Sequence, residues 1–92
     1  MHILRLEYAV PDFDAFKEAF DSDPIGRERS GVRRYRLLRP TSDPNCVMID
    51  LEFDSASEAE AVHAALRELW DRVDVMHSPQ AQIVEAVEIK EH

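Results

Sequence analysis

Polar and apolar residues alternate along two segments of the chain with the period of two that is typical of a half-buried β-strand. In residues 3–10 every second side chain is large and apolar, and Pro11 ends the segment because proline has no N–H to donate to a sheet. Residues 32–39 repeat the alternation and stop at Pro40. The pattern therefore predicts one strand over each segment.

Two further strands are expected later in the chain. Residues 46–53 alternate in the same way, and the preceding residues 41–45, Thr-Ser-Asp-Pro-Asn, favour a turn. This spacing predicts that 32–39 and 46–53 form a hairpin. Ser78-Pro79 predicts a break, and the last strand is expected over residues 82–90, whose main apolar residues are Ile83, Val87 and Ile89.

Helical spacing of apolar residues marks two other segments. Asp12 is a suitable N-cap for the first helix, which should end near Pro24. Its apolar stripe consists of three rings at spacings of three and four: Phe13, Phe16 and Phe20. Ser55 and Glu58 have capping-box spacing, and apolar residues recur at helical spacing from there to about Val73.

The resulting order is strand, helix, strand, strand, helix, strand. This is the order of the ferredoxin-like βαββαβ fold, an α+β architecture in which two helices cover one face of a four-stranded antiparallel sheet. The sequence contains no linker, internal repeat or low-complexity run. A single domain over residues 1–92 is therefore expected.

The alternation also assigns side chains to the two faces of the sheet. The helix-covered face is expected to hold Leu4, Leu6, Tyr8, Val10, Tyr35, Leu37, Val47, Ile49, Leu51 and Phe53. The uncovered face should hold Ile3, Arg5, Glu7, Ala9, Val32, Arg34, Arg36, Leu38, Cys46, Met48, Asp50 and Glu52. If Tyr35 pairs with Leu51, then Arg36 lies opposite Asp50 and Arg34 lies opposite Glu52, and each pair joins opposite charges.

The uncovered face is thus a neutral mosaic of charged and apolar side chains. Paired charges can be buried, whereas unpaired ones would cost several kcal/mol each. We interpret the face as the interface of a two-fold homodimer. A short chain buries only about 60–65% of its unfolded surface and gains much from association. The alternative is a solvated face whose ion pairs are each worth less than about 1 kcal/mol.

Composition narrows the class of protein. Apolar residues make up 45% and charged residues 33% of the chain, with only two glycines and five prolines, which indicates a globular domain. The net charge of −8 argues against nucleic acid as a partner, and no apolar run reaches the ~18–20 residues of a membrane span. The single cysteine, Cys46, has no internal partner, so a cytoplasmic location is expected.

Several stretches of the sequence resemble the dimeric α+β-barrel superfamily, and in particular its antibiotic-biosynthesis-monooxygenase-like proteins. The similar stretches are residues 10–21, 27–31, 35–39 and 51–61. The resemblance implies two sheets that meet face to face as a dimeric barrel, with a ligand cleft between each sheet and its helices. Members of the superfamily include cofactor-free oxygenases that act on phenolic or polyaromatic substrates, haem-degrading enzymes and small-molecule isomerases.

The candidate site residues are those expected to border such a cleft. His63 and Trp70 are seven residues apart on the second helix, so the indole could stack on an aromatic ligand while the imidazole, the catalytic candidate, moves a proton or ligates a metal. Tyr8 and Tyr35 are the further ligand-binding candidates. Alternatively, Trp70 caps the core and His63 lies at the solvent boundary. Both an enzyme and a non-catalytic dimer that binds a small ligand or a partner therefore stay open.

No cofactor or metal site is expected. The histidines, at positions 2, 63, 77 and 92, are scattered, and Cys46 has no second thiol nearby. The resemblance implies that haem-degrading members use an asparagine on the first strand, a tryptophan on the second helix and a downstream histidine. This chain has Trp70 and His77 but no asparagine near Glu7 and Tyr8, which argues against haem oxygenation.

Arginine is concentrated in one part of the chain. Six of the eleven basic residues lie within positions 27–39: Arg27, Arg29, Arg33, Arg34, Arg36 and Arg39. They could hold an anionic substrate such as a carboxylate or phenolate. The alternative is structural: Arg34 and Arg36 neutralise Asp50 and Glu52, and Arg27 and Arg29 lie in a loop that reaches the partner subunit.

Overall fold

The computed structural model describes residues 1–23, 26–71 and 77–92, with backbone only for 77–79. It contains six elements in the expected order. They are β1 (His2–Ala9), α1 (Phe13–Asp21), β2 (Arg34–Leu38), β3 (Cys46–Phe53), α2 (Ala56–Trp70) and β4 (His77–Glu85).

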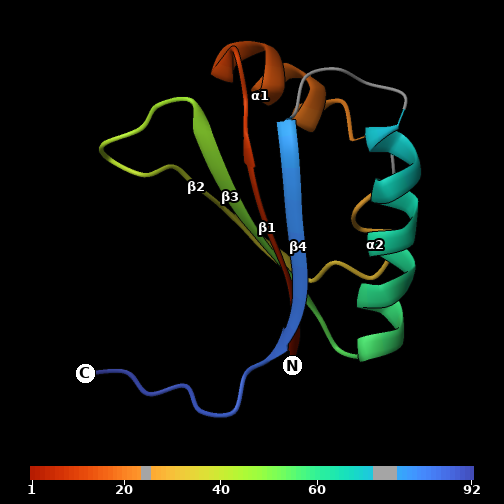
Figure 1. Cartoon of the computed structure of the whole chain (residues 1–92). Coiled ribbons are helices and arrows are strands. Elements are labelled where there is room, and N and C mark those ends of the chain that lie inside the picture. The colour runs from red at the N-terminus through yellow and green to blue at the C-terminus, as the bar shows by residue number, and fades with distance from the viewer. Residues whose placement is uncertain (24–25, 72–76) are drawn as a thin grey trace.

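The four strands form one antiparallel sheet with the order β2-β3-β1-β4. Figure 1 shows α2 along one face of this sheet and α1 near its upper end. Both helices contact the same face, since Phe16 of α1 packs on Tyr8 and α2 contacts β1, β3 and β4. The ferredoxin-like α+β fold expected from the sequence is therefore confirmed.

Both helices begin where the sequence predicts. The Asp12 carboxylate accepts hydrogen bonds from the backbone N–H groups of Asp14 and Ala15. The Ser55 hydroxyl accepts from the Glu58 N–H at 3.3 Å and donates to the Glu58 carboxylate at 3.1 Å. α2 ends at Trp70, and the expected end near Val73 lies outside the described residues.

β2 is shorter than the predicted segment 32–39, and the placement of Val32 on the uncovered face is wrong. Val32 is 9% exposed and belongs to the hydrophobic core. Its N–H donates to the Arg27 carbonyl at 3.0 Å, so a turn holds the backbone before the strand begins. The predicted register of the hairpin is confirmed, because Tyr35 pairs with Leu51.

The predicted boundaries of the last strand, 82–90, are also wrong. β4 occupies His77–Glu85 and pairs with β1, whose first residue, His2, lies opposite Glu85. The Ser78-Pro79 pair lies inside β4 at a register shift, and an edge strand tolerates proline there. The expected strand residues Val87 and Ile89 fall beyond β4 and are 87% and 71% exposed.

The core lies between the covered face of the sheet and the two helices. Phe53, Leu4 and Val47 are fully buried there, as the alternation predicts. Other buried members of this core are Leu6, Tyr8, Val10, Phe16, Ile49, Leu51, Ala59 and Val62. Tyr35 is the exception on this face at 44% exposure, because β2 is an edge strand.

The uncovered face is tied together by ion pairs across three strands. Arg36 Nη2 donates to Asp50 Oδ2 at 2.8 Å, and Arg34 Nε donates to Glu52 Oε2 at 2.8 Å, which confirms both predicted pairs. Arg5 of β1 adds two hydrogen bonds of 2.9 Å to the same Asp50 carboxylate. The arginines cover the acidic side chains, so Asp50 is 1% exposed before any partner is present.

This network should make the free energy of unfolding depend on pH. The guanidinium of Arg5, and then that of Arg36, holds the pKa of the Asp50 carboxyl below its usual value of 3.8. The resulting stabilisation is complete above the pKa of the unfolded state and is lost as pH falls through the lower folded pKa. We expect Asp50→Asn to lower the free energy of unfolding at pH 6 by about 2 kcal/mol. Below pH 4 the free energy of unfolding of the variant should fall less steeply than that of the wild type. Urea titrations across that range measure both effects.

Asp54→Asn is the matched control, because Asp54 pairs with Arg33 at the surface and is 66% exposed. A surface pair contributes less than about 1 kcal/mol. Equal losses in the two variants would contradict the central role of Asp50.

Candidate functional site

Three of the four candidate residues lie together between α2 and the sheet. The Trp70 ring lies 6.1 Å from the Tyr8 ring and 6.4 Å from the His63 ring, centroid to centroid, and both contacts are edge-on. His63 and Trp70 are two helical turns apart on one side of α2, as their spacing predicts. Tyr8 reaches them from the covered face of β1.

The environment of Tyr8 sets what its hydroxyl can do. The side chain is 5% exposed, and burial raises the pKa of the phenol well above its usual value of 10.0. The phenol therefore stays protonated at neutral pH and can serve as a hydrogen-bond donor rather than a base. No hydrogen bond joins Tyr8 and His63 among the described residues. His63 and Trp70 are both half-buried, so their rings are reachable from solvent.

Tyr35, the fourth candidate, lies elsewhere. Its ring packs edge-on against Phe20 of α1, with 5.2 Å between centroids. Phe16 connects the two regions, since it lies 5.8 Å from Phe20 and 5.7 Å from Tyr8. The structure therefore separates Tyr35 from the cluster of Tyr8, Trp70 and His63 by two phenylalanine rings.

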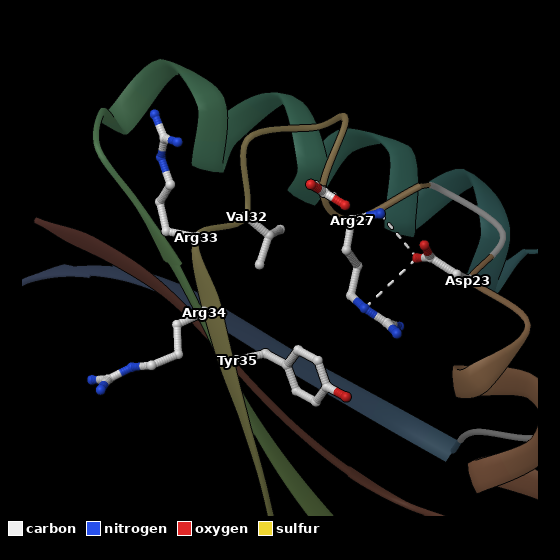
Figure 2. A pocket seen from close by; sticks show the side chains of 7 residues that line it. Asp23, Arg27, Val32, Arg33, Arg34 and Tyr35 are labelled. Carbon is white, nitrogen blue, oxygen red and sulfur yellow. Dashed lines mark hydrogen bonds and ion pairs between the residues drawn. The ribbon is translucent and has the colours of Figure 1, made fainter.

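Tyr35 borders an open hollow of about 370 Å³ beside β2. Figure 2 shows the Tyr35 and Arg27 side chains pointing toward each other across it, while Arg34 points to the opposite side of the strand. Because side chains from both faces of the sheet contribute, the hollow lies at the edge of β2. Its lining consists of Asp23, Arg27, Glu28, Val32, Arg33, Arg34 and Tyr35.

Arg27 forms one wall of this hollow. The guanidinium carbon lies 4.0 Å from the centre of the Phe20 ring and 4.9 Å from that of Tyr35, which is cation–π geometry. Arg27 Nη1 donates to the Phe20 carbonyl at 2.8 Å, and Nε lies 3.6 Å from the Asp23 carboxylate. Arg27 therefore folds back onto its own chain.

The loop that carries Arg27 is anchored to the start of α2. Gly31 has a φ of +98°, and a side chain at this position would collide with the carboxylate of Glu58, the capping residue. Three arginines beyond the loop have carboxylate partners, since Arg33 pairs with Asp54, Arg34 with Glu52 and Arg36 with Asp50. Arg39 lies over the Phe13 ring instead, with 4.6 Å from the guanidinium carbon to the ring centre. This supports the structural interpretation of the arginine-rich segment.

The described residues do not provide a haem site of the pattern that the resemblance implies. β1 has no asparagine, and Trp70 packs on the buried ring of Tyr8. His77, expected in the loop after α2, is instead the first residue of β4, and its side chain lies outside the described atoms. Among the described residues, no group of three or more His, Cys, Asp or Glu side chains is placed to hold a metal ion.

No helix in the described part of the chain has the length and apolar character required to span a membrane.

Comparison with solved structures shows the fold in several proteins of low sequence identity. SnoaB, a cofactor-independent oxygenase from Streptomyces nogalater, is 13% identical with a TM-score of 0.78, over 96% of this chain and 94% of that one. The haem degrader MhuD from Mycobacterium tuberculosis, with two haems bound, is 17% identical with a TM-score of 0.71, over 99% and 100%. A dimeric ferredoxin-like protein from an uncultured marine organism is 8% identical with a TM-score of 0.71, over the whole of both chains.

Other matching structures carry the name antibiotic biosynthesis monooxygenase. The chain therefore has the fold of the antibiotic-biosynthesis-monooxygenase-like proteins, as the resemblance in its sequence suggests. No protein-family model and no curated protein matches the sequence.

Stacking of Arg27 should stabilise the edge of the domain. Arg27→Lys keeps the charge but loses the planar group that contacts Phe20 and Tyr35. We expect the free energy of unfolding to fall by about 1 kcal/mol, measured by urea denaturation. Arg29→Lys, at an exposed position of the same loop, is the control and should change little. If the free energy of unfolding falls equally in both variants, the planar group of Arg27 adds nothing, and Arg27 contributes only its charge.

Proposed function

We propose that the protein is a cofactor-independent enzyme, an oxygenase or isomerase, that acts on a small aromatic substrate bound beside Trp70. The observation that carries the proposal is the meeting of an indole, an imidazole and a protonated phenol at Trp70, His63 and Tyr8. SnoaB supports it, because the same fold carries cofactor-independent oxygenase activity in that protein.

The three side chains suit three tasks. The half-buried Trp70 ring offers a face on which an aromatic substrate stacks. His63 takes a proton from a phenolic or enolic hydroxyl, since imidazole is a general base at neutral pH. The Tyr8 hydroxyl donates a hydrogen bond to the charge that deprotonation leaves on the substrate. The deprotonated substrate then supplies the electrons that reduce oxygen, so that no cofactor is required.

A second candidate function is non-catalytic binding of a small ligand. It is favoured by the edge-on contact of Trp70 with the 5% exposed Tyr8, which fills part of the space between α2 and the sheet. In this case Trp70 caps the core and His63 takes no part in chemistry.

Oxygen uptake separates the two functions. With quinol and anthrone substrates, the enzyme proposal predicts that the protein accelerates oxygen consumption and that His63→Ala reduces the rate by about 100-fold. Trp70→Phe should mainly raise KM, because it weakens stacking. His92→Ala, at an exposed histidine, should leave the rate unchanged. Unchanged uptake in both site variants would contradict the assigned site.

Fluorescence of Trp70, the single tryptophan, reports binding without turnover. If anthraquinone quenches it while quinol and anthrone give no catalysed uptake, the non-catalytic function is supported and the enzyme proposal fails.

The uncovered face of the sheet supports a homodimer as the working form. Most charges on the face are already paired, since Arg5 and Arg36 bind Asp50 and Arg34 binds Glu52, which lowers the cost of burying it. The dimeric ferredoxin-like neighbour adds support from the same fold.

Sedimentation equilibrium tests the dimer. The protein should sediment at twice its 10.6 kDa mass at micromolar concentration. Met48→Glu places a second carboxylate opposite Glu7 in the middle of the uncovered face, where Met48 pairs with Glu7 and Leu38, and should give monomers. Ala65→Glu, on the exposed side of α2, is the control and should remain dimeric. A wild-type mass of 10.6 kDa at every concentration would exclude the dimer.

A further inference from the structure

One arginine of α2, Arg67, borders the candidate site at Trp70. It comes four residues after His63 and three before Trp70, and residues at these spacings are neighbours on the surface of an α-helix. Leu66, the residue before it, packs against the core. Arg67 is exposed and therefore lies on the solvent side of the line that joins His63 and Trp70.

The direction of its side chain favours contact with a ligand at this site. Side chains of an α-helix lean toward its N-terminus, which directs Arg67 over the turn that carries His63. A guanidinium has five N–H donors in a fixed plane and forms paired hydrogen bonds with a carboxylate. A carboxylate on a ring stacked against Trp70 would therefore lie within reach of Arg67.

Arg67 also differs from the other arginines of the described chain in its lack of a partner. Ion pairs with carboxylates are formed by Arg5, Arg27, Arg33, Arg34 and Arg36. Arg39 lies over the Phe13 ring, and Arg29 lies against Gly26. Arg67 forms no ion pair, side-chain hydrogen bond or ring contact with another described residue, although Asp71 follows at the spacing of a helical ion pair. Its donors are therefore available to a ligand.

The charge of the protein makes a cation at this position significant. The net charge of −8 repels anions at long range. Within α2, Glu58, Glu60 and Glu68 add to this repulsion, and Arg67 is the only arginine or lysine of the helix. A single cation beside the candidate base thus offers an anionic group the one favourable position that α2 contains.

The alternative role of Arg67 is structural. It lies in the last turn of α2, where a positive charge stabilises the helix dipole. A purely structural role predicts an effect of Arg67 on the free energy of unfolding and none on the choice of ligand, so the two roles can be separated by experiment.

We infer that Arg67 is a specificity-determining residue that binds a carboxylate on the aromatic substrate. The substrate class is then an aromatic acid that also carries a phenolic or enolic hydroxyl, such as a dihydroxybenzoate. Its ring stacks on Trp70 and its hydroxyl faces His63, while its carboxylate meets Arg67 on the solvent side. The inference rests on the proposed function and names the substrate class of that same site.

The test compares two probes that differ only in charge. Anthraquinone-2-carboxylate and anthraquinone-2-carboxamide have the same rings and nearly the same shape, and quenching of Trp70, the single tryptophan, measures the dissociation constant of each. We expect the wild type to bind the carboxylate about tenfold more tightly than the carboxamide at low salt. The preference should decrease when the salt concentration rises to about 0.5 M.

Variants assign the preference to the arginine. In Arg67→Gln the ratio of the two dissociation constants should fall from about ten to about one, because a neutral amide attracts a carboxylate no more than a carboxamide. Arg67→Lys keeps the charge at the end of the helix but loses the planar pair of donors, so a preference of about threefold should remain. Arg29→Gln, which removes an exposed arginine away from α2, should keep the wild-type preference.

The outcomes distinguish this inference from the proposed function. If neither probe quenches Trp70 in the wild type, the proposed site fails, and the inference fails with it. If both probes bind the wild type equally, or if Arg67→Gln retains the preference for the carboxylate, the site stands and only the role of Arg67 is overturned. Urea denaturation of Arg67→Gln measures any structural contribution separately.

Discussion

The buried carboxylate of Asp50 fixes the arrangement on which the rest of the structure depends. It accepts hydrogen bonds from Arg5 on β1 and Arg36 on β2, so one side chain of β3 ties three strands together. A slip of one residue in either pairing would turn Asp50 to the covered face and leave its charge in the core. The register is therefore specified by electrostatics on one face as strongly as by apolar packing on the other.

The composition of the covered face follows from that register. The register turns the side chains of Tyr8 and Tyr35 toward the helices. Their rings form a continuous row with those of Phe16, Phe20 and Trp70. The row has a buried middle and two accessible ends, because β1 is central and β2 is an edge strand. One end carries His63 and can support acid–base chemistry. The other end carries Arg27, whose donors already bind the Phe20 carbonyl and Asp23, so it serves structure rather than catalysis.

Sequence patterns predicted the elements that are fixed locally. The caps at Asp12 and Ser55 and the hairpin pairs of Arg34 and Arg36 depend on residues within one helix turn or one hairpin, and all are confirmed. The second partner of Asp50, Arg5, was not predicted because it comes from a strand distant in sequence. The spacing of His63 and Trp70 indicated a shared side of α2, and the alternation in residues 3–10 placed Tyr8 on the covered face beside them. The separation of Tyr35 from this cluster was not predicted, because it depends on where Phe20 of α1 packs.

The wrong predictions all concern the ends of strands, which are fixed by backbone partners and not by the apolar pattern. β4 stops at Glu85 because β1 starts at His2, and it continues through Pro79 because a register shift accommodates the proline. Val32 leaves the strand because the Arg27 carbonyl, five residues earlier, binds its N–H. The alternation of Val87 and Ile89 continues past the register of β1 with β4, which ends at the pair of His2 and Glu85.

The two faces of the sheet are suited to different tasks. The uncovered face carries the Asp50 network, whose arginines and carboxylates neutralise one another, and it is the face that the proposed homodimer would use. The covered face carries the cluster of Tyr8, Trp70 and His63, which is the site of the proposed enzyme. The two proposals therefore assign self-association and ligand binding to opposite faces of one sheet, and the Asp50 network, which sets the register, keeps the two faces apart.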